Sequence, residues 1–271
     1  MCKLAMFPYV KPQYATQALR LAKALTQPMT KYDRDAFGVA AITADDRLYT
    51  GRWEINNAWS TRGLVSGPYP KRPKSILLHS RMATHGYGLI NAHPHVSPNK
   101  KVALIHNGVV STQGLDLRRS ECDSEGILNA YTDAGVDYDP REMQTALNRV
   151  HGYYALGIYS RTNDVGSWAV DIVRDSIAPL HYMFVDQIKL GVFLTDPEHL
   201  REAASRIGLR LDGVVSRRIK DNIHLRFDTS TGQRVHTETI KEARVQYFHN
   251  YANDDEERYK AWRGHMKTIL V

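Results

Sequence analysis

The residues best suited to chemistry lie between positions 79 and 110, in the segment HSRMATHGYGLINAHPHVSPNKKVALIHNGVV. Imidazole is a common zinc ligand and exchanges protons near neutral pH, so this segment invites both metal binding and acid–base chemistry. Its spacing matches neither an HExxH helix nor a CxxC knuckle, and no thiol pair lies nearby. We therefore expect no metal site and no cofactor. The histidines concerned are His79, His85, His93, His95 and His106.

A second candidate group is the thiol of Cys2, which directly follows Met1 in the opening MCKLAMFPYV. An isolated cysteine usually fills space as a small apolar residue, so position alone does not make it a nucleophile. The sequence has 2 cysteines, Cys2 and Cys122, too few for a disulfide framework, although a single bridge stays open. We expect both to be thiols in a reducing compartment.

The composition is that of a globular chain. Its 271 residues are 42% hydrophobic and 24% charged, which disfavours disorder. No apolar run reaches the roughly 18 residues of a membrane span, and the opening lacks the apolar core of a secretory signal, so we predict a cytoplasmic protein. The net charge of +7 favours anionic partners, but the basic residues are scattered. Phosphorylated metabolites fit this charge as well as nucleic acid does.

The elements that must position these groups follow from hydrophobic periodicity. Helical spacing predicts helices over residues 13–27, 121–135, 143–150 and 197–207, and Ser120 with Asp123 has the spacing of a capping box. Short runs rich in β-branched and aromatic residues predict strands at 37–42, 47–55, 75–84, 101–108, 153–160, 167–175, 181–186 and 189–195, with a hairpin at 222–240. The strands form two groups with helices between and after them. This order favours an α+β fold in which two stacked sheets lie between helical layers.

Five motifs in a fixed order carry a family resemblance: Cys2, HSRMATHG, NAHPHVS, HNGVV and CDSEGIL. Together they resemble the glutaminase domain of class II glutamine amidotransferases, which are N-terminal nucleophile hydrolases. The likeness is nearest to the amino-terminal half of glucosamine-6-phosphate synthase and continues through GYYALGIYS, RDSIAPL and FLTD to about residue 200. It implies a four-layer αββα sandwich of two mainly antiparallel sheets. We expect a glutaminase domain over residues 2–240 and a polar C-terminal extension over 241–271.

The resemblance also implies a mechanism. Removal of Met1 would leave Cys2 with both a nucleophilic thiol and a free α-amine, which is a far better base at neutral pH than a lysine amine. Asn107 and the backbone N–H of Gly108 would bind the oxyanion. The family pattern assigns Arg81, helped by Thr84 and His85, to the glutamine carboxylate, and Asp123 to its ammonium. The other four histidines of the segment are expected to be structural, hydrogen-bonding loops around the pocket, and Cys122 to pack.

Each of these residues has a simpler alternative. Asn107-Gly108 is also a strong type I′ turn signal, Arg81 could be a surface charge, and Asp123 could only cap a helix. The chain departs from the family at Lys3, where glycine is usual, and at Met82, where tryptophan is common. It also departs at YDRDAFG (32–38), which keeps Asp35 and Gly38 but shifts the arginine to Arg34.

Three functions follow from the sequence, in decreasing order of support. The first is a glutaminase that hydrolyses L-glutamine and delivers ammonia to an acceptor on a separate synthase. The second is an N-terminal cysteine hydrolase acting on another amide. The third is a catalytically weakened, basic module that binds nucleic acid or another partner, and it ranks last because the catalytic set is complete. A homo-oligomer is compatible with all three, and none involves a membrane.

Overall fold

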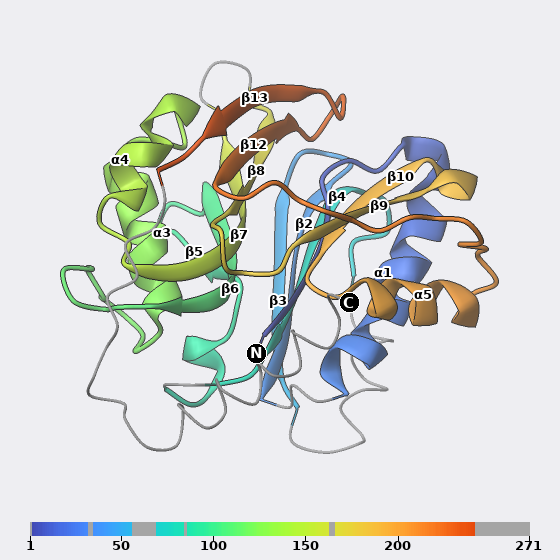
Figure 1. Ribbon diagram of the computed structural model, residues 1–271, viewed down its shortest axis with the longest axis horizontal. Helices are drawn as coiled ribbons and strands as arrows, with labels where there is room; N and C mark the ends of the chain where they lie inside the picture. Colours follow the sequence, from blue (N-terminus) through green and yellow to red (C-terminus); the bar gives the residue numbers. More distant parts are fainter. Residues whose placement is uncertain (1, 32–34, 56–68, 84–85, 163–165, 242–271) are drawn as a thin grey trace.

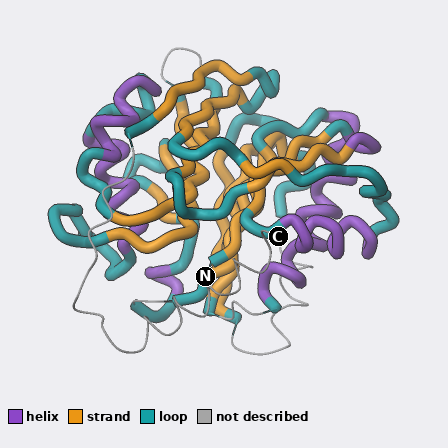
Figure 2. Tube along the Cα trace, in the orientation of Figure 1, coloured by secondary structure: helices purple, strands orange, loops and turns teal. Residues whose placement is uncertain are grey.

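The computed structural model describes residues 2–31, 35–55, 69–83, 86–162 and 166–241. Within them, the strands form two sheets in which every paired strand is antiparallel to its neighbour (Figures 1 and 2). The first sheet has the order β11 (Arg217–Arg218), β9 (His181–Val185), β10 (Leu190–Leu194), β1 (Lys3–Phe7), β4 (Pro73–Arg81), β2 (Ala36–Thr43) and β3 (Leu48–Glu54). The second has the order β13 (Arg234–Thr239), β12 (Ile223–Asp228), β8 (Trp168–Arg174), β7 (Gly152–Arg161), β6 (Val102–Val110) and β5 (His95–Val96).

Helices cover the outer face of each sheet. One side carries α1 (Ala15–Thr30) and α5 (Pro197–Arg206), and the other carries α3 (Asp123–Asp133) and α4 (Met143–Leu147) (Figure 1). Four 3₁₀ turns are described: η1 (Pro12–Tyr14), η2 (Leu89–Asn91), η3 (Pro140–Glu142) and η4 (Asp186–Ile188). None of the described helices is long and apolar enough to cross a membrane.

Three apolar clusters hold the layers together, and β1 shows how one strand serves two of them. Leu4 and Met6 lie in the cluster between the two sheets, whereas Ala5 and Phe7 join the cluster under α1 and α5. This is the two-residue alternation of a strand whose faces are both covered. The third cluster packs α3 and α4 on β6 and β7. The predicted αββα sandwich is therefore confirmed.

The predicted elements agree with the structure apart from their ends and the shortest strands. α1 runs to Thr30, with Pro28 inside its last turn, and α4 stops at Leu147 rather than 150. The two-residue strands β5 and β11 carry too few residues for a periodic signal, and the five-residue opening strand β1 was not predicted. Residues 242–271, nearly all of the predicted extension, lie outside the described residues.

Candidate active site

Cys2 lies at the edge where β1 meets β4. The register pairs Lys3 with Ser80, so the next position of each strand brings Cys2 beside Arg81. The Cys2 sulfur is 3.4 Å from the backbone nitrogen of Met82 and 3.5 Å from its backbone oxygen. By the alternation along β1, Cys2 shares its strand face with Leu4, whose side chain lies between the sheets. The thiol is thus partly buried at the end of the inter-sheet core.

Arg81 is the last residue of β4 and is only 4% exposed. Its Nη2 donates to the Gly86 carbonyl at 2.8 Å, so the guanidinium spans the loop that follows the strand. Asp35 fixes this turn, because its carboxylate accepts from the backbone N–H of Ala83 at 2.5 Å. The surface-charge alternative for Arg81 is therefore wrong. Thr84, His85 and Arg34 lie outside the described residues.

Asn107 and Gly108 lie within β6 and pair with Ala155 and Tyr154 of β7, so the type I′ turn alternative is wrong. A Cβ on Gly108, whose φ is +156°, would lie 2.0 Å from the Tyr153 carbonyl oxygen, so only glycine fits. The Asn107 side chain is fully buried. Neither its nitrogen nor its oxygen has a hydrogen-bond partner in the part of the chain that the structure describes.

β6 is tied to the strand that carries Arg81. The His79 ring on β4 lies 2.9 Å from the carbonyl oxygen of His106, the residue before Asn107. Because His79 also faces Leu4 in the register of β1 and β4, the three strands bring Asn107 to the same end of the core as Cys2. Two positions more than one hundred residues apart in the chain thereby become neighbouring parts of one site.

Asp123 begins α3 on the other side of this region. Its carboxylate accepts from the Val110 backbone N–H at 2.9 Å and from the Ser124 hydroxyl at 3.2 Å. Its side chain keeps 21% of its surface exposed, and the His106 ring lies 3.8 Å away. The carboxylate therefore bridges α3 to the end of β6 and still faces solvent with one side.

The predicted capping box is wrong. The residue before α3 is Cys122, which makes no side-chain cap, and Ser120 instead donates through both its backbone N–H and its hydroxyl to Glu125, at 2.7 and 2.8 Å. Burial raises the pKa of the Glu125 carboxyl, but hydrogen bonds from Ser120 and Arg119 outweigh it and leave that pKa below its ordinary value. Glu125 thus holds the loop that leads into Asp123.

Known proteins resemble this chain in part of its sequence and in its fold. No family model matches the chain. Glutamine–fructose-6-phosphate aminotransferases (isomerizing) are similar in sequence: that of Bacteroides thetaiotaomicron is 31% identical over 148 residues, 47% of this chain and 22% of that protein. The enzyme of Bacillus anthracis is 33% identical over 97 residues, 31% of this chain and 16% of the enzyme. The matches thus span about a fifth or less of these relatives.

Solved structures agree in fold over nearly the whole chain. The allosteric regulatory enzyme of purine biosynthesis superposes with a TM-score of 0.62 at 16% identity, over 90% of this chain and 50% of the enzyme. The B. subtilis glutamine phosphoribosylpyrophosphate amidotransferase gives a TM-score of 0.60 at 16% identity, over 89% of this chain and 49% of its own. A class-II glutamine aminotransferase domain protein from Silicibacter pomeroyi gives 0.53 at 15% identity, over 89% and 100%.

The chain has the fold of the class II glutamine amidotransferases. This is the fold of N-terminal nucleophile hydrolases, and it confirms the resemblance carried by the five sequence motifs.

Within this amidotransferase fold, the buried histidines are held neutral. Burial, opposed by a hydrogen bond to His106, lowers the pKa of His79 to about 3, and burial with Arg52 nearby lowers that of His95 to about 4. Burial also brings the pKa of His93 well below its ordinary value. His79 and His106 make the expected hydrogen bonds, the latter to Ser124 at 2.9 Å. His93 does not, since neither of its nitrogens has a partner among the described residues.

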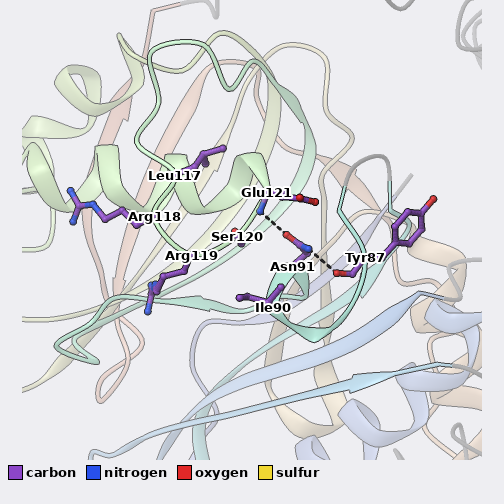
Figure 3. Close-up of a pocket in the computed structure, with 8 residues that line it drawn as sticks. All are labelled: Tyr87, Ile90, Asn91, Leu117, Arg118, Arg119, Ser120 and Glu121. Carbon is purple, nitrogen blue, oxygen red and sulfur yellow. Dashed lines mark hydrogen bonds between the residues drawn. The ribbon is translucent and has the colours of Figure 1, made fainter.

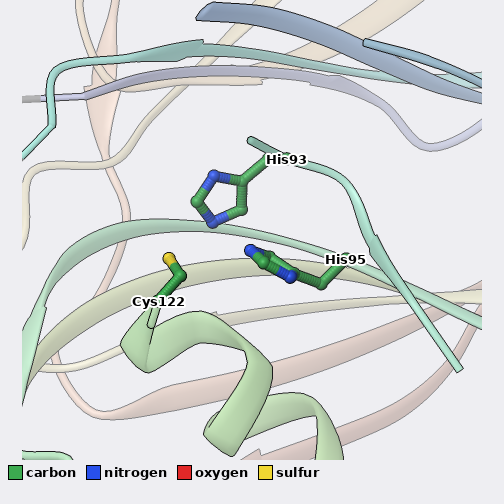
Figure 4. A group of neighbouring side chains, drawn as sticks. All are labelled: His93, His95 and Cys122. Atoms are coloured by element: carbon green, nitrogen blue, oxygen red, sulfur yellow. The ribbon is translucent and has the colours of Figure 1, made fainter. Parts of the chain in front are cut away.

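His93 instead packs as an aromatic ring. Its centroid lies 3.8 Å from that of His79 and 4.9 Å from that of His95, with Cys122 beside them (Figure 4). Burial and the adjacent Asp123 raise the pKa of the Cys122 thiol to about 12, so the thiol stays protonated and cannot act as a nucleophile. This agrees with the packing role expected of Cys122.

An open depression of about 420 Å³ is lined by Tyr87, Ile90, Asn91 and residues 117–121 (Figure 3). Asn91 forms part of its wall, donating to the Tyr87 carbonyl at 2.8 Å and accepting from the Glu121 backbone N–H at 2.9 Å. None of Cys2, Arg81 and Asn107 lines it. Through these two hydrogen bonds, Asn91 joins the loop after Arg81 to the loop before Asp123.

Two of the departures from the family pattern, at Lys3 and Met82, lie within the described residues. Lys3 lies on the opposite face of β1, with Ala5 and Phe7, so its side chain points toward the α5 layer and not into the site. The Met82 side chain is 41% exposed, and its backbone nitrogen and oxygen contact the Cys2 sulfur. Sequence reasoning missed Thr195, whose hydroxyl accepts from the Leu4 backbone N–H at 2.9 Å and so holds the start of β1. The FLTD motif was its only signal.

Proposed function

We propose that this chain is a glutaminase that hydrolyses L-glutamine to glutamate and ammonia through a thioester on Cys2. The observation that carries the proposal is Asn107. A fully buried side-chain amide without a described partner is costly, and it is repaid when a ligand supplies the missing hydrogen bond. It lies at the same end of the core as the Cys2 thiol, where an amide substrate would be attacked.

The reaction needs a base at the thiol. With Met1 removed, the α-amine of Cys2 has a pKa of about 7.7–8.0 and is roughly a tenth neutral at pH 7. It takes the thiol proton as the sulfur attacks the carboxamide carbon, and returns that proton to the departing nitrogen, which leaves as ammonia. Water then attacks the thioester carbon. The carbon–sulfur bond breaks, glutamate leaves and the thiol is restored.

The developing negative charge on the carboxamide oxygen requires donors that are already in place. The Asn107 amide and the backbone N–H of Gly108 are suited to this, since β6 is held rigidly between β5 and β7. Arg81, buried at the end of β4, suits the α-carboxylate of glutamine, because a guanidinium can hold a carboxylate by two parallel hydrogen bonds. Asp123, partly exposed across the site, suits the α-ammonium.

Both Arg81 and Asp123 favour free glutamine over other amides. A substrate that lacked the α-carboxylate could not make the two parallel hydrogen bonds that a buried guanidinium offers to a carboxylate. Turnover of glutamine should therefore exceed that of N-acyl amides without an α-carboxylate. Equal rates on both would favour the second function, hydrolysis of another amide.

The acceptor of the ammonia is proposed to lie on a separate protein. The described elements between residues 3 and 239 belong to the two sheets, their covering helices and short 3₁₀ turns, so none of them forms an acceptor-binding unit. We infer that residues 2–240 constitute the glutaminase domain. A synthase that gains glutamine-dependent activity only when this chain is added would support the assignment.

The decisive experiment compares the wild-type chain with Cys2→Ser and Cys122→Ser. Intact mass should show loss of Met1, glutamate should appear from glutamine, and a diazo-ketone glutamine analogue should label wild type once. Cys2→Ser should lose labelling and activity, whereas Cys122→Ser should keep both, because its thiol is buried and protonated. A protein that retains Met1, or labelling that follows Cys122, would contradict the proposal.

A further inference from the structure

A second cluster of ligand-type side chains lies on the hairpin of β12 and β13, outside the glutaminase site. The register pairs His224 with Glu238, and His236 lies two residues before Glu238 on the same strand. Residues two apart on a strand, and residues directly opposite each other, share one face of a sheet. One nitrogen of each histidine and one carboxylate oxygen therefore converge, all within 4.8 Å of one another.

The converging atoms lack the hydrogen bonds that buried polar atoms normally make. His224 Nδ1, His236 Nε2 and Glu238 Oε2 are all buried, and none has a hydrogen-bond partner among the residues that the structure describes. His236 Nε2 and Glu238 Oε2 lie 3.5 Å apart, which is too long for a good hydrogen bond. Three such atoms facing one point are costly to bury unless a ligand binds them.

The other ring nitrogen of His224 is held as in a metal site. His224 Nε2 lies 2.7 Å from a carboxylate oxygen of Asp171. Asp171 is fully buried and also accepts from Nε and Nη2 of Arg226, both at 2.7 Å, so it faces His224 as an acceptor. His224 therefore donates to it through Nε2, which leaves Nδ1 facing the cluster as the ligand atom. Histidines that bind metals typically have such a carboxylate behind them.

We propose that His224, His236 and Glu238 form a binding site for a divalent transition metal of the zinc type. Two imidazoles and one carboxylate are a ligand set that zinc uses with water in the fourth position. Metal–ligand bonds of about 2.1 Å place tetrahedral ligand atoms about 3.4 Å apart. His236 Nε2 and Glu238 Oε2, at 3.5 Å, already have this spacing, and the other pairs, all within 4.8 Å, need to close by at most about 1.4 Å. The His236 and Glu238 side chains, 20% and 34% exposed, have the room to do so and leave a path for the ion.

A metal bound there would stabilise the edge of the second sheet. β13 is the outermost strand of its sheet, and within the described residues β12 is the one strand that pairs with it. A metal bound to His224 on one strand and to His236 and Glu238 on the other cross-links them, and Asp171 connects the site to β8. The site is independent of glutamine chemistry, so its failure would leave the proposed function unaffected.

The test uses the full chain, stripped with a chelator and titrated with Zn²⁺, with Co²⁺ as a spectroscopic substitute and Mg²⁺ as a hard-cation control. Native mass spectrometry should show one zinc, and a free zinc concentration of 100 times Kd should raise the Tm by about 5–10 °C. His236→Ala and Glu238→Gln should each weaken zinc binding by at least about tenfold and remove the d–d bands of bound Co²⁺.

Two variants serve as matched controls. His199→Ala removes a histidine that faces a carboxylate at a similar distance, 3.7 Å from Asp196, and should leave zinc affinity unchanged. Cys122→Ser alters the other histidine group, His93 with His95, and should also leave it unchanged. Wild type that binds no zinc, zinc lost on Cys122→Ser, or zinc retained at full affinity by both His236→Ala and Glu238→Gln would overturn the proposal. Circular dichroism of each variant separates loss of a ligand from loss of the fold.

Discussion

Two fully buried polar side chains of the same sheet, Asn107 on β6 and Asp171 on β8, have opposite surroundings. Asp171 accepts from His224, from Arg226 at Nε and Nη2, and from the Tyr131 hydroxyl, all at 2.6–2.7 Å. Asn107 has no described partner for either atom of its amide. A satisfied buried network stabilises one structure, whereas an unsatisfied group costs stability and is available to a ligand. The contrast separates the part of the sheet that stabilises the fold, around Asp171, from the part that is available to a ligand, around Asn107.

The largest expected effect comes from breaking the satisfied side of this comparison. Arg226→Met keeps the length of the side chain but leaves the Asp171 carboxylate buried without its counter-ion. We expect the free energy of unfolding in urea to fall by about 3–5 kcal/mol. The glutaminase kcat per folded molecule should stay near wild type at low temperature. A loss under 1 kcal/mol, or a kcat loss without destabilisation, would mean that Asp171 is not the structural centre proposed.

Asn107→Ala tests the unsatisfied side. We expect kcat for glutamine to fall by about 10²- to 10³-fold, as when one oxyanion donor is lost. Stability should change little or rise, since the variant removes a buried amide that the described chain leaves unpaired. Asn107→Asp, which cannot donate when ionised, should be at least as impaired. Kinetics and urea unfolding on the same samples distinguish this outcome from a packing role, which would lower stability and spare kcat.

The contrast between the two residues marks the limit of what the sequence predicts. Hydrophobic periodicity predicts β6 and β8, because successive apolar residues of each strand pack against layers on opposite faces of the sheet. It finds neither the Asp171–Arg226 pair nor the link of His79 to His106, since these contacts join separate strands whose register depends on the whole sheet.

The candidate site was predictable for a different reason. Cys2, Arg81 and Asn107 stand in motifs with a fixed order, so family resemblance names them without any geometry. Local rules were misleading at the same positions: Asn-Gly is a turn signal, yet at Gly108 the glycine lets β7 approach closely in mid-strand. Ser120 has the spacing of a helix N-cap, yet its hydroxyl donates to the Glu125 carboxylate instead. At both Gly108 and Ser120, contacts with other elements override the local sequence pattern.

A smaller effect concerns pH and the neutral histidines near the site. An unfolded histidine has a pKa of about 6.5, whereas His95 in the fold has a pKa of about 4 and His79 about 3. Between these values the unfolded chain binds more protons, so stability is full above about pH 6.5 and falls as the pH decreases. We expect the free energy of unfolding to drop by at least about 1 kcal/mol between pH 7.5 and 5.5.

His95→Asn should flatten that pH dependence, because one of the groups that takes up a proton on unfolding is gone. Arg226→Met should shift the whole curve down across this window. The Asp171 pKa is depressed below that of an unfolded aspartate, so the contribution of this pair is present above about pH 3.9 and is lost only at lower pH. Urea unfolding midpoints of wild type, His95→Asn and Arg226→Met at four pH values measure these two effects. A wild-type curve that is flat from pH 7.5 to 5.5 would contradict the assignment of neutral, buried rings.

The smallest effect is expected at Lys3, the position where the family has glycine beside the nucleophile. Because Lys3 shares the face of β1 with Ala5 and Phe7, its side chain lies on the helical side of the sheet and not with the thiol. Lys3→Gly should therefore change kcat/KM for glutamine by less than about threefold, a difference of about 0.6 kcal/mol at most. It should cost about 0.5–1 kcal/mol of stability, as glycine does inside a strand. A tenfold gain in kcat/KM would instead place the lysine against the reacting sulfur, and would mean that the alternation along β1 breaks at its first residue.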